Sequence, residues 1–243
     1  MTAELLKESA VLARQYGVRL HTHLCETKDE ENFMLAREGV RPLAYMERLG
    51  WIGDDVWFAH GIHFNDEELR ELARTGTGVA HCPISNMKLA SGVARIPEML
   101  ELGVPVGLAV DGSASNDGSS LLEELRVGYL LHRLISSEQA PTGYELLKLA
   151  TRGSARLLGR EDIGCLAEGK CADLFMVDAR RLELVGCWES PADVLATVGL
   201  RGPVDLTVVH GKVVVEDGHL TTIDEAAVAE KAQSCCAAYL ANA

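Results

Sequence analysis

The sequence predicts an α/β fold: a parallel sheet covered by helices, then a smaller β module and a closing helix. Two observations carry this prediction. Strand-like and helix-like runs alternate through the first 150 residues, which is typical of βα units. Beyond about Leu158, short strand-like runs joined by turns replace this alternation. We therefore expect one domain over residues 1–158, a β module over 159–221 and a helix over 222–243.

Helices are predicted from capping residues and glycine stops. An amphipathic pattern over residues 5–16 predicts a helix that Gly17 ends. Four Ser, Thr or Asn residues followed three positions later by Glu predict further helix starts, because such pairs form capping boxes. These four residues are Thr27, Asn65, Ser120 and Thr142. We also expect a break near Gly39 and Pro42 and a short helix over 96–102.

The strands are expected between those helices, as short apolar runs. In the first part they are predicted at 18–25, 56–60, 78–82 and 104–110. The last of these runs is continuously apolar, as expected of a strand buried on both faces of a parallel sheet. Later runs predict antiparallel strands at 171–177, 204–210 and 212–216. Acidic residues at 224 and 225 favour the start of the closing helix.

Charge and composition exclude several kinds of partner. The 243 residues carry 23 basic and 36 acidic side chains, and the formal net charge of −13 disfavours nucleic acid and anionic membranes. No uncharged apolar stretch approaches the roughly 18 to 20 residues of a membrane-spanning helix, so we expect no membrane span. Seven scattered cysteines without a C-x-x-C pair, and no visible secretion signal, favour a cytoplasmic protein with reduced thiols.

Polar side chains follow all four strands of the first part, where loops begin. They are His21 and His23, His60, His81, and Asp111. Because the carboxyl ends of parallel strands meet at one edge of a sheet, we expect these groups to converge. Imidazole and carboxylate hold Zn²⁺ or Fe²⁺ in sites that leave a position open for water, whose pKa the metal lowers to about 7. Metal-activated hydrolysis is therefore expected, with Glu26 placed for proton transfer.

The same strand ends carry four longer motifs. They are HTHLCET at 21–27, FAHGIHF at 58–64, HCPISNMKLASG at 81–92 and VGLAVDGSASND at 106–117. Together they resemble the amidohydrolase superfamily, in its cytosine deaminase and chlorohydrolase-like branch. GCLAEGKCADLFMVD at 164–178 is similar to the return of that family from barrel to β-sandwich. The resemblance implies a partial TIM (β/α)8 barrel, strands five to eight with their helices, plus the C-terminal part of a small β-sandwich.

The resemblance also implies a role for each site residue. His23 and Asp111 would bind one divalent metal, Zn²⁺ or alternatively Fe²⁺, with further ligands from an N-terminal half. Glu26 would shuttle a proton to the substrate ring, His60 would orient water or polarise the substrate, and Asp111 would accept the proton of the water. Asn86, on the loop after the third strand, would contact the substrate. The motifs assign no role to four further histidines, which are expected to be structural or solvent-exposed: His63, His132, His210 and His219.

These roles predict a hydrolase of non-peptide carbon–nitrogen bonds that deaminates a small purine-like heterocycle such as 8-oxoguanine, to whose deaminases residues 85–117 are most similar. Alternatives are a triazine, pterin or S-adenosylhomocysteine-type aminohydrolase or chlorohydrolase, and a non-catalytic half-barrel that binds partners or acts as a scaffold. Glu26, three residues after His23, disfavours the cyclic-amide branch of the superfamily, which includes hydantoinases and dihydroorotases. The lack of a C-x-x-C pair excludes zinc deaminases of the cytidine deaminase kind.

The predicted barrel strands are too few for a closed barrel. A complete (β/α)8 barrel takes about 250 residues, whereas some 158 residues here have βα character. We therefore expect the C-terminal portion of a longer enzyme, with little or no activity of its own and a homo-oligomeric full-length form.

Overall fold

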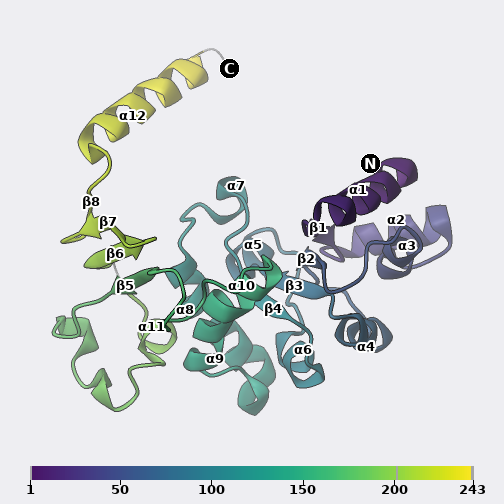
Figure 1. Cartoon of the computed structure of the whole chain (residues 1–243), viewed down its shortest axis with the longest axis horizontal. Coiled ribbons are helices and arrows are strands. Elements are labelled where there is room, and N and C mark those ends of the chain that lie inside the picture. The colour runs from purple at the N-terminus through teal and green to yellow at the C-terminus, as the bar shows by residue number, and fades with distance from the viewer. Residues whose placement is uncertain (1, 201, 242–243) are drawn as a thin grey trace. The chain divides into compact units, whose positions relative to one another are not determined.

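The computed structural model describes residues 2–200 and 202–241 (Figure 1). These residues form two compact units. The first extends to Cys165 and includes Cys187–Gly199, and the second holds Leu166–Gly186 and the residues from Leu200 onward. The predicted domain boundaries assign residues 159–165 and 187–199 to the β module. In the structure, these residues cluster with the first unit.

The first unit is built on a four-stranded parallel sheet with strand order β1-β2-β3-β4. The strands are Leu20–Leu24 (β1), Val56–His60 (β2), Gly78–His81 (β3) and Val106–Leu108 (β4). Each strand pairs with the next one along the chain, and helices connect the paired strands. This is the arrangement of a (β/α) barrel. All four lie within the ranges expected from the sequence, and their carboxyl ends share one edge of the sheet.

Four helices of the first unit begin directly after the residues expected to cap them, which are Thr27, Asn65, Ser120 and Thr142. Asn65 and Glu68 form a complete capping box, and Gly17, Gly39 and Gly103 end helices in the left-handed conformation. The longer helices are Ala3–Tyr16 (α1), Lys28–Glu38 (α2), Pro42–Arg48 (α3), Asp66–Thr75 (α4), Ile96–Leu102 (α6) and Leu121–Ser136 (α8). Three short helices had no strong sequence signal: Pro83–Lys88 (α5), Ser113–Asn116 (α7) and Val194–Thr197 (α11).

The helical region over residues 143–157 packs closely on β4 and is interrupted there. It consists of Gly143–Lys148 (α9), a π-helical turn at Leu149–Gly153 and Ser154–Leu157 (α10). The Ser154 hydroxyl lies in hydrogen-bond range of two carbonyl oxygens that it can donate to, those of Leu108 at 2.9 Å and Leu149 at 3.0 Å. A Cβ on Gly153 would overlap the carbonyl oxygen of Val106, so only glycine permits this approach.

The core of the first unit lies between the sheet and the helices. Its largest fully buried apolar side chains come from β2 and from four helices: Phe58, Leu69, Leu72, Ile96, Met99, Leu125 and Leu146. Burying side chains of this size contributes about 1.5–3 kcal/mol each, which makes this layer the main source of stability for the unit. The rigid layer fixes the strand ends, where the polar motifs begin.

The second unit contains an antiparallel sheet with strand order β5-β6-β7-β8. Its strands are Leu174–Met176 (β5), Leu206–Val209 (β6), Lys212–Glu216 (β7) and His219–Leu220 (β8), and its helix is Glu225–Ala241 (α12). His210 and Gly211 both adopt positive φ in the tight turn between β6 and β7. Among the described residues of the chain, no helix has the length and apolar character needed to cross a membrane.

Candidate active site

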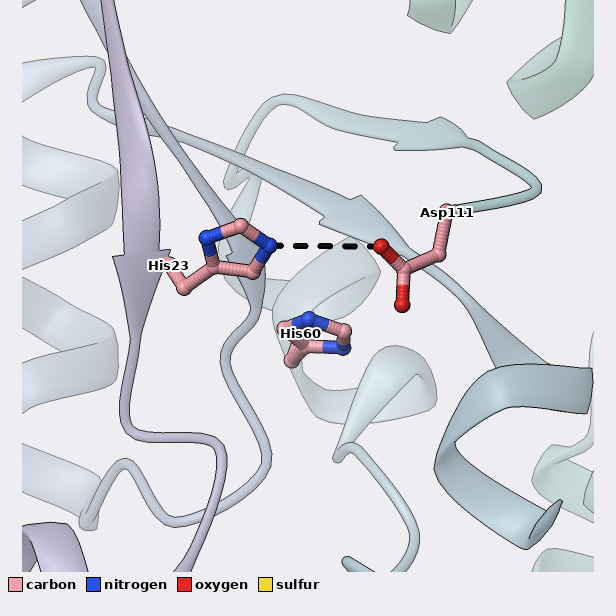
Figure 2. Close-up of side chains that lie close together, drawn as sticks. All are labelled: His23, His60 and Asp111. Carbon is pink, nitrogen blue, oxygen red and sulfur yellow. Dashed lines mark ion pairs between the residues drawn. The ribbon is translucent and has the colours of Figure 1, made fainter. Parts of the chain in front are cut away.

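Three side chains meet at the carboxyl edge of the parallel sheet (Figure 2). They are His23 of β1, His60 at the end of β2 and Asp111 just beyond β4, and one ligand atom from each lies within 4.8 Å of the others. His23 Nε2 is 3.9 Å from Asp111 Oδ1, and the rings of His23 and His60 stack with centroids 5.2 Å apart. Two imidazoles and a carboxylate match the donor set of catalytic zinc and non-haem iron sites, so these residues fit a divalent cation.

The backbone leaves regular strand geometry at this edge. Cys25, His60 and Asp111 have φ values of 53°, 70° and 62°, a left-handed conformation that costs a residue with a side chain of order 1–3 kcal/mol. A regular strand would place His60 on the same face as Phe58, in the helix layer. The left-handed backbone instead turns its imidazole toward His23, which belongs to the opposite face of the sheet.

Asp111 is held by two serines. Its Oδ2 accepts hydrogen bonds from Ser85 Oγ at 2.6 Å and from Ser115 Oγ at 2.9 Å, which leaves Oδ1 facing His23. Burial tends to raise the pKa of Asp111, but the bonds from Ser85, Ser115 and the Gly112 backbone outweigh burial and keep the pKa below its usual value. The group is therefore an ionised carboxylate at neutral pH, as a metal ligand or a proton acceptor must be.

Asn86 orients His60. Asn86 lies in helix α5, so the expectation of a loop at this position was wrong: Pro83 starts a helical turn directly after β3. The Asn86 side chain is fully buried, and its Oδ1 is 2.8 Å from His60 Nδ1. With the amide oxygen of Asn86 facing the ring, His60 carries its proton on Nδ1 and presents the Nε2 lone pair to the site, while Asn86 Nδ2 has no hydrogen-bond partner among the described residues. The contact with substrate assigned to Asn86 stays a prediction.

Glu26 lies beside this group. Its Oε2 is 3.7 Å from His60 Nε2, and its Oε1 accepts a hydrogen bond from Ser91 Oγ at 3.2 Å. The Glu26 N–H donates to Glu30 Oε2 at 2.9 Å, so the carboxylate expected to complete the capping box of Thr27 holds the backbone of Glu26 instead. The four residues predicted for metal binding and acid–base chemistry thus lie together.

Two histidines at strand ends do not join the cluster of metal-ligand atoms. His21 stacks on Trp57 with ring centroids 3.7 Å apart, and burial lowers its pKa. His81 is fully buried on the helix side of β3, where its Nε2 lies 3.0 Å from Nε2 of His132 in α8. His132, expected to be structural or solvent-exposed, is thus a buried partner of His81.

Sequence reasoning missed the serines that support the site. Ser85 precedes Asn86 in the HCPISN motif, Ser115 lies in DGSASND and Ser91 lies in KLASG. Their presence inside the motifs was the available signal. Their targets depend on the short helices α5 and α7 and on the turn after α5, which no capping pattern predicted.

Comparison with protein families and curated proteins gives consistent matches. The model of the Amidohydrolase family matches residues 1–214. The 8-oxoguanine deaminase of Pseudomonas aeruginosa is 45% identical over 242 residues, which cover 100% of this chain and 54% of that protein. The hydroxydechloroatrazine ethylaminohydrolase of Pseudomonas sp. strain ADP is 47% identical over 232 residues, or 94% of this chain and 48% of that protein. The chain spans about half the length of the curated relatives it matches.

Solved structures show the same architecture. Atrazine chlorohydrolase TrzN from Arthrobacter aurescens TC1, complexed with zinc, matches with a TM-score of 0.91 and 36% identity over 96% of this chain and 52% of that chain. An adenosine deaminase from Xanthomonas campestris with bound zinc matches with a TM-score of 0.89 and 30% identity over 96% and 54%. The expected α/β class, the partial barrel and the family resemblance are confirmed, and the relatives are named deaminases and hydrolases. The chain belongs to the amidohydrolase family.

Proposed function

We propose that this chain supplies the metal-binding and proton-transfer residues of an aminohydrolase that removes the exocyclic amine of a purine-like heterocycle such as 8-oxoguanine. The observation that carries the proposal is the convergence of His23, His60 and Asp111 within 4.8 Å, with Glu26 Oε2 3.7 Å from His60 Nε2. The 8-oxoguanine deaminase that matches 100% of this chain supports the substrate class. A hydroxytriazine is the alternative substrate, because the ethylaminohydrolase is 47% identical.

His23, His60 and Asp111 would hold one divalent cation, Zn²⁺ in keeping with the zinc in two similar structures. Such a cation supplies a Lewis acid that lowers the pKa of water to about 7. Asp111 would accept the proton of the attacking water on Oδ1, since two serine hydroxyls already bind Oδ2. With its proton on Nδ1, His60 would present the Nε2 lone pair to the cation, so in this proposal it serves as a ligand and neither donates to the substrate nor orients water itself.

Glu26 would give its proton to the ring nitrogen next to the amine-bearing carbon. Water then adds to that carbon as Asp111 takes one of its protons, and Asp111 returns this proton to the amine. The carbon–nitrogen bond breaks and ammonia leaves, and the remaining hydroxyl proton returns to Glu26 as the ring carbonyl forms. Ser91 donates to Glu26 Oε1 and leaves Oε2, on the His60 side, as the oxygen that carries the proton. We keep low activity of the chain alone, a cytoplasmic location and a homo-oligomeric full-length form as predictions.

Ammonia release tests the proposal. The zinc-loaded chain and a version extended upstream are assayed with 8-oxoguanine, guanine, isoxanthopterin and hydroxytriazines. We expect the extended version to release ammonia from 8-oxoguanine, and the chain alone to release little or none. Glu26→Gln in the extended version should lower turnover by about 10²–10⁴-fold, the usual contribution of general acid–base catalysis.

The matched control is Glu38→Gln at the end of helix α2, which removes the same charge outside the site and should leave turnover unchanged. An extended version that binds zinc yet acts on none of these compounds, or that tolerates Glu26→Gln, would contradict the proposal. If neither metal nor turnover is found, the non-catalytic half-barrel is the better description.

A further inference from the structure

Glu124 of helix α8 is a buried carboxylate with no part in the proposed reaction. Its side chain is fully buried, and no basic side chain of the described residues forms an ion pair with it. Burial raises its pKa to about 7, although hydrogen bonds from Ile84 and Asn116 oppose that rise. A buried carboxylate without a cation costs stability unless hydrogen bonds satisfy it, so the identity of its two donors matters.

The two donors belong to the two short helices that follow β3 and β4. Glu124 Oε2 accepts the backbone N–H of Ile84 in α5 at 3.0 Å. Glu124 Oε1 accepts Nδ2 of Asn116, the last residue of α7, at 2.5 Å. Asn116 Oδ1 in turn accepts the N–H of Ser119 at 2.6 Å. One carboxylate therefore connects the chain after β3 with the chain after β4.

Both short helices support the cluster of metal-ligand atoms. From α5, Ser85 donates to Asp111 Oδ2 at 2.6 Å and Asn86 contacts His60 Nδ1 at 2.8 Å. From α7, Ser115 donates to the same Asp111 oxygen at 2.9 Å. Ile84 and Asn116 are the immediate chain neighbours of these contacts. A shift of either helix would thus move a group that holds a metal ligand.

The hydrogen-bond inventory explains why this position needs a carboxylate. Ile84 offers only an N–H, and Asn116 must offer its NH₂ group because its oxygen is bound to Ser119. Glu124 therefore faces two donors and must present two acceptors. Glutamine, which has nearly the same shape, presents one acceptor and one donor, so one of the two links would be lost.

We propose that Glu124 is a positioning residue for the metal centre: it fixes α5 and α7 so that Ser85 and Ser115 hold Asp111 while Asn86 holds His60. This inference rests on the proposed function, because the contacts matter to chemistry only if the cluster binds a metal. Groups that orient metal ligands typically contribute 10–100-fold to metal affinity. Glu124 would act one step further out, through both helices at once.

The test compares Glu124→Gln with the double variant Asn116→Asp/Glu124→Gln. In the double variant, the introduced glutamine can accept from Ile84 and donate to the introduced aspartate, which can still accept from Ser119, so every hydrogen bond and the net charge are restored. Glu123→Gln is the matched control, since Glu123 is the exposed neighbour on the same helix turn. Two quantities are measured on the full chain: Co²⁺ affinity by equilibrium dialysis, and the imidazole ¹⁵N shifts of His60 without metal.

We expect Glu124→Gln to weaken Co²⁺ binding by about 10-fold or more and to move the ¹⁵N shifts of His60 toward the tautomer average. The double variant should recover both values, and Glu123→Gln should change neither. Unchanged affinity and unchanged His60 shifts in Glu124→Gln would overturn the inference. So would loss of both in the double variant.

The two readouts separate this inference from the proposed function. A wild-type chain that binds no Co²⁺ would count against the proposed metal centre, while the His60 shifts would still decide the role of Glu124. Circular dichroism shows whether each variant folds. If Glu124→Gln does not fold, the double variant decides: native His60 shifts support the linkage, and disturbed shifts or failure to fold contradict it.

Discussion

His60 and His81 occupy equivalent positions, at the ends of neighbouring parallel strands, and yet they lie in different layers of the first unit. His60 has a φ of 70°, turns into the polar cluster and is anchored by Asn86. His81 keeps the strand conformation, remains on the helix side and contacts His132. Backbone conformation at the last residue of the strand thus decides whether a histidine serves the site or the core.

The two regions also differ in how completely their polar atoms are bonded. Both oxygens of Glu26 and both oxygens of Asp111 have a polar neighbour in the site. In the buried histidine pair, Nδ1 of His81 and Nδ1 of His132 have no hydrogen-bond partner among the described residues. Asn86 Nδ2 is the one such atom of the described residues beside the site, whose other polar groups form a connected network, whereas the histidine pair is an isolated contact that stabilises the unit only through one bond and apolar packing.

The comparison predicts the largest effect for a direct ligand. Asp111→Asn removes the ionised carboxylate that faces His23, and we expect Co²⁺ affinity to fall by more than about 100-fold, beyond the usual effect of an outer group. Asp66→Asn is the control, because Asp66 pairs with Arg95 at 2.6 Å on the surface, away from the site. Equilibrium dialysis measures both, and equal affinities would show that the cluster does not bind metal through Asp111.

Asn86 should produce the next largest effect. Asn86→Leu removes the acceptor for His60 Nδ1, so the imidazole can change tautomer and rotate. We expect a loss of about 10–100-fold in Co²⁺ affinity. Asn86→Asp keeps an acceptor and should retain most of the affinity. The same dialysis experiment decides, and a result in which Leu and Asp behave alike would show that this hydrogen bond does not orient the ligand.

The histidine pair should affect stability and leave metal affinity unchanged. His132→Leu leaves Nε2 of His81 buried without a hydrogen-bond partner, which should lower the free energy of unfolding by about 1–3 kcal/mol. The double variant His81→Leu/His132→Leu removes both polar groups and should leave the free energy of unfolding nearly unchanged. Urea unfolding followed by tryptophan fluorescence measures both variants. Loss of Co²⁺ affinity in the double variant would contradict the separation of the two regions.

The same pair predicts a pH dependence. Burial lowers the pKa of His132 from 6.5 to about 4 and lowers that of His81 as well. Both are neutral when folded, so their effect on stability is constant above pH 6.5. As pH falls from 6.5 toward 4, the unfolded chain gains protons that the folded chain resists, and stability is lost, by about 3 kcal/mol for His132 alone. The double leucine variant should lose less stability between pH 7 and pH 5 than the wild type.

Much of the fold could be predicted, because it depends on local signals. Capping residues such as Asn65, glycine stops such as Gly17 and the apolar runs of the four strands act within a few residues of the elements they define. The convergence of His23, His60 and Asp111 followed from topology, since parallel strands end at one edge. The family resemblance added the substrate ring as the destination of the Glu26 proton and the metal-ligand role of His23.

The remaining features depend on backbone details that pattern rules do not reach. Sequence alone did not distinguish His60 from His81, because the left-handed φ at His60 arises from the turn that follows it. Helix α5 was not predicted because Cys82 is not a capping residue and the helix has only 6 residues. The hydrogen bonds of Ser85, Asn86 and Glu124 all depend on that helix, so the supporting layer of the site became visible only in the structure.

The smallest predicted effect lies inside the site, between the two serines that hold Asp111. Ser85 is fully buried and 2.6 Å from Asp111 Oδ2, whereas Ser115 is partly exposed and 2.9 Å away. Each hydroxyl lowers the pKa of Asp111, so each Ser→Ala change should raise it, and Ser85→Ala should raise it more because water replaces the lost donor less easily in the buried position. Protonation of Asp111 competes with metal binding. The pH at which Co²⁺ binding is lost on acidification should therefore rise, and it should rise further for Ser85→Ala than for Ser115→Ala. Dialysis from pH 3 to 7 compares the two variants, because the pKa of Asp111 lies below its usual value. The reverse order would mean that the exposed hydroxyl, and not the buried helix α5, controls the charge of the ligand.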